Sequence, residues 1–230
     1  MTQRHRDKRL KAWRYLLAFP CSIWWNFRLL PLRQAVRMPL LVSHRTCMSF
    51  SHGSLRLDAV RPKVGLVKIG FATSQCSDFR HDRTRLDVHG LLHVAGYCAI
   101  GAGCSIEVSE NATLTLGDDF HLGPRSLVIC HRQITFGTHT LTSWNCSFMD
   151  TDQHELVDDG GRCVNADRPV GVGDGCWFGC HSIVTKGVVL APRTTVGAAS
   201  HPVGCYDEPD TVIAGNPAKV VRRGVHWSGR

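Results

Sequence analysis

The sequence predicts an all-β protein, a parallel β-helix built from six-residue repeats and preceded by a helical extension. Three observations lead to this prediction. Apolar residues recur at every sixth position in three blocks of the 230-residue chain, many of them are followed directly by glycine, and the first 46 residues differ in composition from the rest. An apolar residue every six positions beside a turn-permitting residue fits short strands joined by tight corners.

The repeat itself comes in three blocks separated by shifts of register. Its members are Val88, Val94, Ile100, Ile106 and Ala112, then Leu116, Leu122, Val128 and Ile134, then Val172, Phe178, Val184, Leu190 and Val196. A helical period of 3.6 residues fits none of these segments. Each repeat is expected to point one side chain into the interior, with each coil stacking on the one before.

Residues 1–46 form the predicted extension. They hold ten Lys and Arg against Asp7 alone, so the other 184 residues carry 17 basic and 18 acidic groups and are close to neutral. The net charge of +8 therefore does not indicate a nucleic-acid partner. Tryptophans and other aromatic residues alternate with these basic residues, in helical pieces broken by Pro20, Pro31 and Pro39. Such a segment could lie on an anionic membrane or cap the open end of the solenoid, and the sequence leaves both open.

The apolar run Tyr15–Phe27 is too short for the ~20 residues of a spanning helix. It also lacks the small-residue cleavage site of a signal peptide. These observations favour a cytoplasmic protein, with any membrane contact peripheral and at the inner face.

The solenoid is predicted to cover residues 47–205, and the period fails within it from about Thr135 to Val170. This polar stretch predicts a loop near residues 144–169, extruded from one corner, where insertions commonly serve binding. Residues 206–230 form a C-terminal tail that contains the sequence NPAKV.

The eleven cysteines do not indicate a disulfide scaffold. Their number is odd, several lie among aliphatic residues, and free cysteine behaves as a small buried hydrophobe. No C-x2-C pair is present, and Cys176 and Cys180 have no matching second pair, so no metal site is predicted.

Three segments resemble the hexapeptide-repeat acetyltransferases, the group that includes the maltose, galactoside and nodulation-factor enzymes. The segments are PVGVGDGCWFG, VIAGNPAKVVR and MDTDQHELVD, and the resemblance covers roughly residues 115–223. It implies a left-handed β-helix, acetyl-coenzyme A as co-substrate, and a homotrimer with sites between neighbouring subunits. The run FPCSIWWNFRLLPLRQAVRMPLLV is similar to segments of enzymes encoded with surface-polysaccharide genes.

His154 is the predicted general base among the 13 histidines. It lies in the polar loop, and a neutral imidazole can accept a hydroxyl proton near neutral pH. Asp152 or Asp150 could fix its tautomer. A cysteine nucleophile would need a constellation that lowers a thiol pKa, which the sequence does not show, so direct attack without an acyl-enzyme is favoured.

The resemblance also implies the binding residues. Gly179, Cys180 and Ala198 match coil residues that line the pantetheine arm, and Lys219 and Arg222 match basic residues that meet the nucleotide phosphates. The chain departs from the family at Val203 and Gly204, where Thr-Lys is common. Arg125 and Ser126 occupy the neighbourhood that lines the sugar.

The predicted function is O-acetylation of a sugar hydroxyl, with N-acetylation of an amino sugar still possible. One alternative is a metal-dependent hydrolase or lyase of the carbonic-anhydrase type, which would need His121, His139 and His154 to converge on a metal ion. Another is a non-catalytic scaffold.

Overall fold

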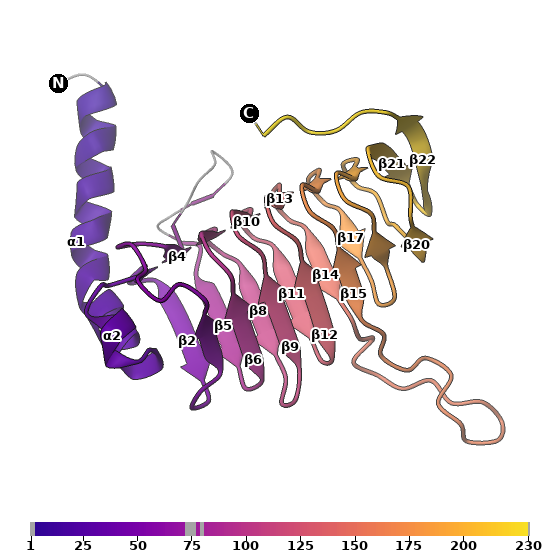
Figure 1. Cartoon of the computed structure of the whole chain (residues 1–230), viewed down its shortest axis with the longest axis horizontal. Helices are drawn as coiled ribbons and strands as arrows, with labels where there is room; N and C mark the ends of the chain where they lie inside the picture. Colours follow the sequence, from indigo (N-terminus) through magenta and orange to yellow (C-terminus); the bar gives the residue numbers. More distant parts are fainter. Residues whose placement is uncertain (1–2, 72–76, 79–80, 230) are drawn as a thin grey trace.

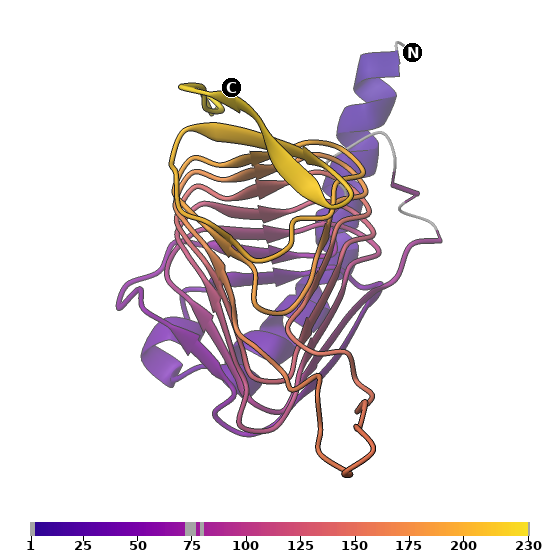
Figure 2. The ribbon, with the colours of Figure 1, turned by 90° about the vertical axis from the view of Figure 1, so that its right-hand side faces the viewer.

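Three parallel β-sheets form the sides of a triangular solenoid, and a long helix crosses its first coil (Figures 1 and 2). The computed structural model describes residues 3–71, 77–78 and 81–229, with side chains from Trp13 onward. The chain visits the three sheets in turn and passes to the neighbouring strand of each sheet one coil later. In Figure 2 it winds clockwise as it approaches the viewer, so the solenoid is left-handed, as predicted.

We call the sheets A, B and C in the order in which each coil visits them. Sheet A contains β1 (Leu40–Val42), β4 (Val67–Ile69), β7 (Cys98–Ile100), β10 (Phe120–Leu122), β13 (Leu141–Thr142), β16 (Trp177–Phe178), β19 (Thr195–Val196), β21 (Thr211–Gly215) and β22 (Ala218–Arg223). Sheet B contains β2 (Thr46–Phe50), β5 (Thr84–Val88), β8 (Ser105–Val108), β11 (Leu127–Cys130), β14 (Ser147–Met149) and β17 (Ile183–Val184). Sheet C contains β3 (Leu55–Leu57), β6 (Leu91–Val94), β9 (Thr113–Leu116), β12 (Gln133–Phe136), β15 (Val170–Val172), β18 (Val189–Leu190) and β20 (Cys205–Tyr206).

The interior is a stack of the repeat residues. Every apolar residue of the three predicted blocks is buried. At the centre of the stack the rings of Phe120, Phe136, Phe148 and Phe178 succeed one another at centroid distances of 4.9, 5.0 and 5.0 Å. Continuous burial on all three sides of each coil supplies the hydrophobic stabilisation of the fold.

The coils continue further than the sequence period suggested. Phe136, Thr142 and Phe148 are buried at six-residue spacing, although the period was expected to fail after Ile134. Strand β12 buries both Ile134 and Phe136, as β9 buries Leu114 and Leu116, and the repeat continues from the second of the two residues, which hides its continuation. The predicted loop leaves the solenoid between β14 and β15, so residues 144–149 belong to the coil.

The two ends of the solenoid also extend beyond the predicted boundaries. Strand β1 at Leu40–Val42 already belongs to sheet A, within the segment expected to precede the solenoid. At the other end β21 pairs parallel with β19, and β22 folds back antiparallel on β21. The NPAKV sequence forms the turn and the start of β22 in this hairpin.

The N-terminal extension caps the first coil. Helix α1 (Gln3–Leu29) runs without interruption through Pro20, which was expected to break it, and is followed by the short α2 (Leu32–Ala35). Pro20 lies on the exposed face, where water can satisfy the carbonyl that a proline leaves unbonded. No helix within the described residues is both long and apolar enough to span a membrane.

Two buried polar side chains of α1 bind the outer edge of β1. The Asn26 amide donates to the Leu40 carbonyl at 2.8 Å and accepts from the Leu40 N–H at 3.1 Å. The Ser22 hydroxyl accepts from the Val42 N–H at 2.9 Å. These contacts satisfy backbone groups that an edge strand would otherwise leave unpaired.

Asn26→Ala is therefore expected to lower the free energy of unfolding by about 1–3 kcal/mol, because it leaves the buried Leu40 N–H without a partner. Chemical denaturation measures this loss. Arg28→Ala, on the exposed side of the same helix, is the matched control and should change stability by less than about 0.5 kcal/mol. Equal stability of the two variants would contradict the capping role of Asn26.

Candidate active site

A cavity of about 400 Å³ lies between the extruded loop and the corner that joins sheets B and C. It is lined by His131, Thr151, Gln153, His154, Glu155, Cys163, Asn165, Ala166 and Asp167. In Figure 2 the loop projects from the bottom corner of the triangle. The His154 side chain is exposed, and within the described chain no side-chain hydrogen bond engages its imidazole. The ring is therefore free to accept a proton from a bound molecule.

Asn165 closes the base of the loop. Its amide nitrogen donates to Asp152 Oδ2 at 2.8 Å and to the His154 carbonyl at 2.9 Å. Its amide oxygen accepts from the Leu156 N–H at 2.6 Å. One side chain thus holds the Asp152 carboxylate and the backbone of His154 and Leu156.

Lys186 ties this arrangement to the solenoid. Its ammonium group donates to Asp152 Oδ2 at 2.5 Å and to the Asn165 carbonyl, and its side chain is only 11% exposed. The hydrogen bond from Lys186, followed by that from Asn165, lowers the pKa of Asp152 from its ordinary value. We call Lys186, Asp152 and Asn165 the loop anchor.

The two carboxylates flanking His154 therefore do not orient its ring in this structure. Asp152 serves the loop anchor. Asp150 is fully buried, and its carboxylate accepts the backbone N–H groups of His131, Arg132 and Gln133 at 2.7, 2.8 and 2.6 Å. That pattern stabilises the corner beneath the loop. Asp152 is better described as a residue that positions His154 through the backbone.

The predicted acceptor residues lie at a different corner, between sheets A and B. Arg125 is paired with Asp82, with 3.1 Å between Nε and Oδ1. Ser126 is 1% exposed, and its hydroxyl accepts the Cys146 N–H at 3.1 Å. The structure does not bring Arg125 and Ser126 together with His154 within one chain.

The predicted cofactor residues gather at that same A–B corner, near the C-terminal end. A Cβ on Gly179 would lie 2.5 Å from the Ala198 backbone nitrogen, so glycine allows these coils to stack closely. The Ala199 N–H donates to the Cys180 carbonyl at 2.8 Å.

The terminal hairpin lies directly over this part of the solenoid, because the Ala218 N–H donates to the His201 carbonyl at 2.8 Å. Lys219 and Arg222 are exposed on β22. Val203 and Gly204, where the sequence departs from the family, are exposed near this hairpin.

The histidines proposed for a metal do not converge. His121 and His139 both contact Asp119, at 3.0 and 2.9 Å, at the corner between sheets C and A. His154 lies at another corner. Among the described residues no group of three or more His, Cys, Asp or Glu is arranged to hold a metal ion.

The cysteines fall into two classes. Burial raises the pKa of Cys98, Cys104 and Cys130 to about 12, so these interior thiols are protonated and inert at neutral pH. Cys163 is exposed and lines the cavity around His154. No sequence motif surrounds Cys163 that would have marked it as a site residue.

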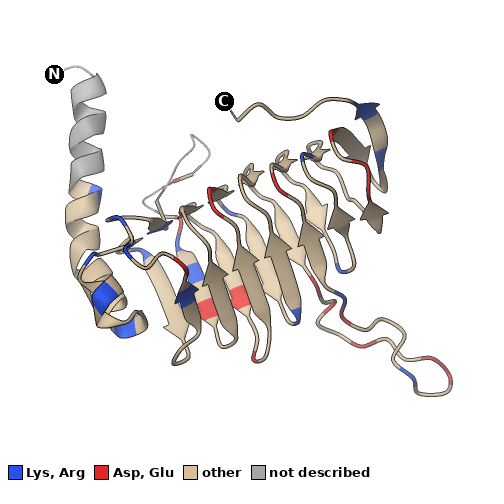
Figure 3. Cartoon of the chain, viewed as in Figure 1, with Lys and Arg blue, Asp and Glu red and all other residues tan. Residues whose placement is uncertain are grey.

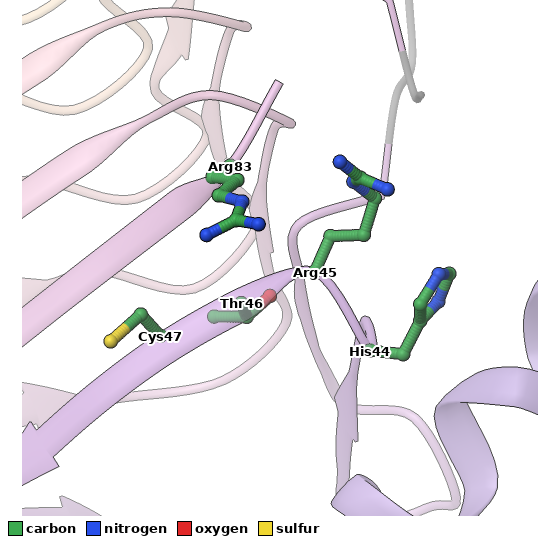
Figure 4. Close-up of a pocket in the computed structure, with 5 residues that line it drawn as sticks. All are labelled: His44, Arg45, Thr46, Cys47 and Arg83. Carbon is green, nitrogen blue, oxygen red and sulfur yellow. The ribbon is translucent and has the colours of Figure 1, made fainter. Parts of the chain in front are cut away.

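A second cavity, of about 270 Å³, lies at the N-terminal end of the solenoid (Figure 4). It is lined by His44, Arg45, Thr46, Cys47 and Arg83, with no carboxylate among them. Within the described part of the chain, Arg45 Nε is buried without a hydrogen-bond partner. The lining of this cavity is therefore basic.

Comparison with known proteins gave no matching family model. An uncharacterized 24.8 kDa protein in the cps region of Klebsiella pneumoniae is 28% identical over 138 residues, 60% of this chain and 61% of that protein. Galactoside O-acetyltransferase of Escherichia coli K12 is 25% identical over 118 residues, 50% of this chain and 56% of that enzyme. The chain thus matches about three fifths of the length of these relatives. The crystal structure of the polySia-specific acetyltransferase NeuO, at 15% identity, superposes with a TM-score of 0.54 over 82% of this chain and 75% of that one, which supports the fold.

Proposed function

We propose that this protein is an acyltransferase that moves an acetyl group from acetyl-coenzyme A to a sugar hydroxyl, with His154 as general base. The observation that carries the proposal is the His154 imidazole, which has no side-chain hydrogen bond to any described residue and lines a cavity beside a loop anchored to the β-helix. Similarity to a galactoside O-acetyltransferase over half of this chain supports the reaction class.

The reaction follows from the position of that imidazole. His154 removes the proton of the acceptor hydroxyl as its oxygen attacks the thioester carbonyl carbon. The carbon–sulfur bond then breaks, coenzyme A leaves as the thiolate, and the proton held by His154 returns to that sulfur. The buried cysteines, whose thiols stay protonated, take no part.

The cofactor is proposed to lie along the A–B corner at Gly179, Cys180 and Ala198. Lys219 and Arg222 fit its nucleotide phosphates, because both are exposed on β22 and neither is in an ion pair with a described carboxylate. Basic side chains free of acidic partners suit phosphate groups.

The proposed assembly is a homotrimer. His154 lies on the loop at the B–C corner, whereas the cofactor and acceptor residues lie at the A–B corner, so one chain does not bring them together. A threefold axis parallel to the solenoid would place the A–B corner of one subunit beside the B–C corner of its neighbour, which completes the site.

The acceptor is proposed to be a saccharide hydroxyl in the synthesis of a surface polysaccharide. Two relatives support this proposal, one found in a cps region and one that acts on galactosides. The metal-dependent hydrolase is disfavoured, because His154 lies at a different corner from His121 and His139.

Release of the coenzyme A thiol in the presence of a panel of sugars and amino sugars tests the function. Lys219→Ala is expected to raise the KM for acetyl-coenzyme A roughly tenfold or more, the size of a lost charge-assisted hydrogen bond, with a smaller loss of kcat. Arg223→Ala is the matched control, since that side chain on the same strand pairs with Glu208 at 2.8 Å. Absence of thiol release with every acceptor would refute the proposed reaction. Equal effects of the two variants on the KM would refute Lys219 as a cofactor-binding residue.

A further inference from the structure

Helix α1 has two unlike faces. The face formed by Ala18, Ser22 and Asn26 is buried against the first coil. The opposite face carries apolar side chains that the described structure leaves exposed, with Trp24 and Leu16 each 65% exposed. The members of this aromatic face are Trp13, Leu16, Phe19, Ile23, Trp24 and Phe27.

The aromatic face is a continuous stripe. Leu16, Phe19, Ile23 and Phe27 follow one another at intervals of three and four residues, which places them on one side of an α-helix. Trp13 and Trp24 lie beside this row, three residues from Leu16 and from Phe27. Isolated exposed apolar residues are ordinary, but a contiguous patch of this kind marks an interaction surface. Tryptophan and phenylalanine are also the side chains that amphipathic helices insert at a membrane surface.

The charge around this face is one-sided. The sequence contains no Asp or Glu between Lys8 and Leu57. Arg28, Arg33 and Arg37 are exposed on or beside α1 and α2, and Figure 3 shows basic residues without acidic ones on the described part of these helices. The basic cavity with Arg45 and Arg83 lies at the same end of the solenoid (Figure 4).

We propose that the aromatic face of α1 binds the surface of an anionic phospholipid bilayer. Apolar side chains would enter the headgroup region, while the flanking arginines meet lipid phosphates. A second copy of the chain is a poorer occupant, because it would bring two arginine-rich surfaces with the same charge together.

This contact also orients the protein. Helix α1 crosses the end of the solenoid, and the coils extend away from it (Figure 1). With α1 lying in the plane of the bilayer, the solenoid axis points away from the membrane, and the β21–β22 hairpin lies at the far end.

Cosedimentation with vesicles tests the proposal. The full chain is expected to bind vesicles that contain phosphatidylglycerol and to bind pure phosphatidylcholine weakly, with affinity falling as salt rises. The double variant Leu16→Ser, Trp24→Ser should bind roughly tenfold less or weaker, from the apolar area withdrawn from the bilayer. Val189→Ser, a residue 47% exposed on β18, is the control and should bind like the wild type.

Three outcomes would overturn the proposal. They are no binding of the wild type to anionic vesicles, unchanged binding of the double variant, or a change of oligomeric mass in that variant by light scattering. Thiol release with a dissolved acceptor should be normal in the double variant. Failure of membrane binding is thereby distinguished from failure of the proposed enzymatic function.

Discussion

Replacement of His154 by alanine is expected to lower kcat roughly 10²–10⁴-fold, the contribution that general-base catalysis typically makes. The loss arises because the proposed mechanism assigns removal of the acceptor proton to the His154 imidazole. The KM for acetyl-coenzyme A should change little, since the proposed cofactor contacts lie at the A–B corner. Steady-state thiol release on a confirmed acceptor measures both quantities.

Other side chains near the cavity serve as controls for this result. Cys163→Ala should retain near-normal turnover, because direct transfer forms no acyl-cysteine. Loss of turnover in Cys163→Ala, together with an acyl group trapped on Cys163 of the wild type, would show that transfer proceeds through an acyl-cysteine instead. If His154→Ala is active while His131→Ala, His139→Ala or His181→Ala is not, a different histidine is the base.

Lys186→Met is expected to lower turnover by up to about 10²-fold, although Lys186 contacts neither substrate in the proposed mechanism. The substitution removes the ammonium group from Asp152 and from the Asn165 carbonyl, which frees the loop to shift His154. A displacement of about 1 Å in a catalytic group can have an effect of this size. Hydrogen exchange of residues 151–168 should rise in parallel.

Matched variants separate positioning from a general structural role. Arg162 forms an ion pair with Asp158 in the same loop, with 2.8 Å between the two side chains. Arg162→Met removes this basic partner of an aspartate and should leave turnover unchanged. Lys186→Arg should restore part of the activity. In a His154→Ala background, Lys186→Met should cause no further loss, because the two residues act through one group. A full additional loss would show that Lys186 acts elsewhere.

The loop anchor also has an expected pH dependence. Because Lys186 lowers the pKa of Asp152, the ionised carboxylate favours the folded loop. Its contribution is present above the ordinary carboxyl pKa of about 4 and is lost as pH falls through the lower value of the folded protein. Limited proteolysis of the loop should therefore accelerate only in acid.

The solenoid could be predicted because its coils repeat the same physical requirement. Most sides of a coil bury an apolar residue, so Val88, Val94 and Ile100 recur six positions apart and are all buried. The repeat was lost after Ile134 because it continues from Phe136, which pairs with Leu116 of the preceding coil and lies two positions out of the register followed up to Ile134. In the sequence, such a change is visible only as a two-residue displacement of the apolar repeat.

The candidate site was less predictable. The loop around His154 was visible as a polar interruption, but Lys186 was not, since it lies in an ordinary coil far from Asp152 in sequence. Asp150 and Asp152 differ by two residues yet have different roles, because one points into the corner and the other towards Lys186. Sequence spacing alone does not distinguish them.

The polar contacts between α1 and β1 have a consequence for association between molecules. An uncovered edge strand can pair with a strand of another chain, and in a β-helix such pairing would stack one solenoid on the next. Asn26 and Ser22 occupy the backbone groups of Leu40 and Val42 that this pairing would use. Helix α1 thus blocks this edge of sheet A against pairing with a strand of another chain, and its removal would expose the edge.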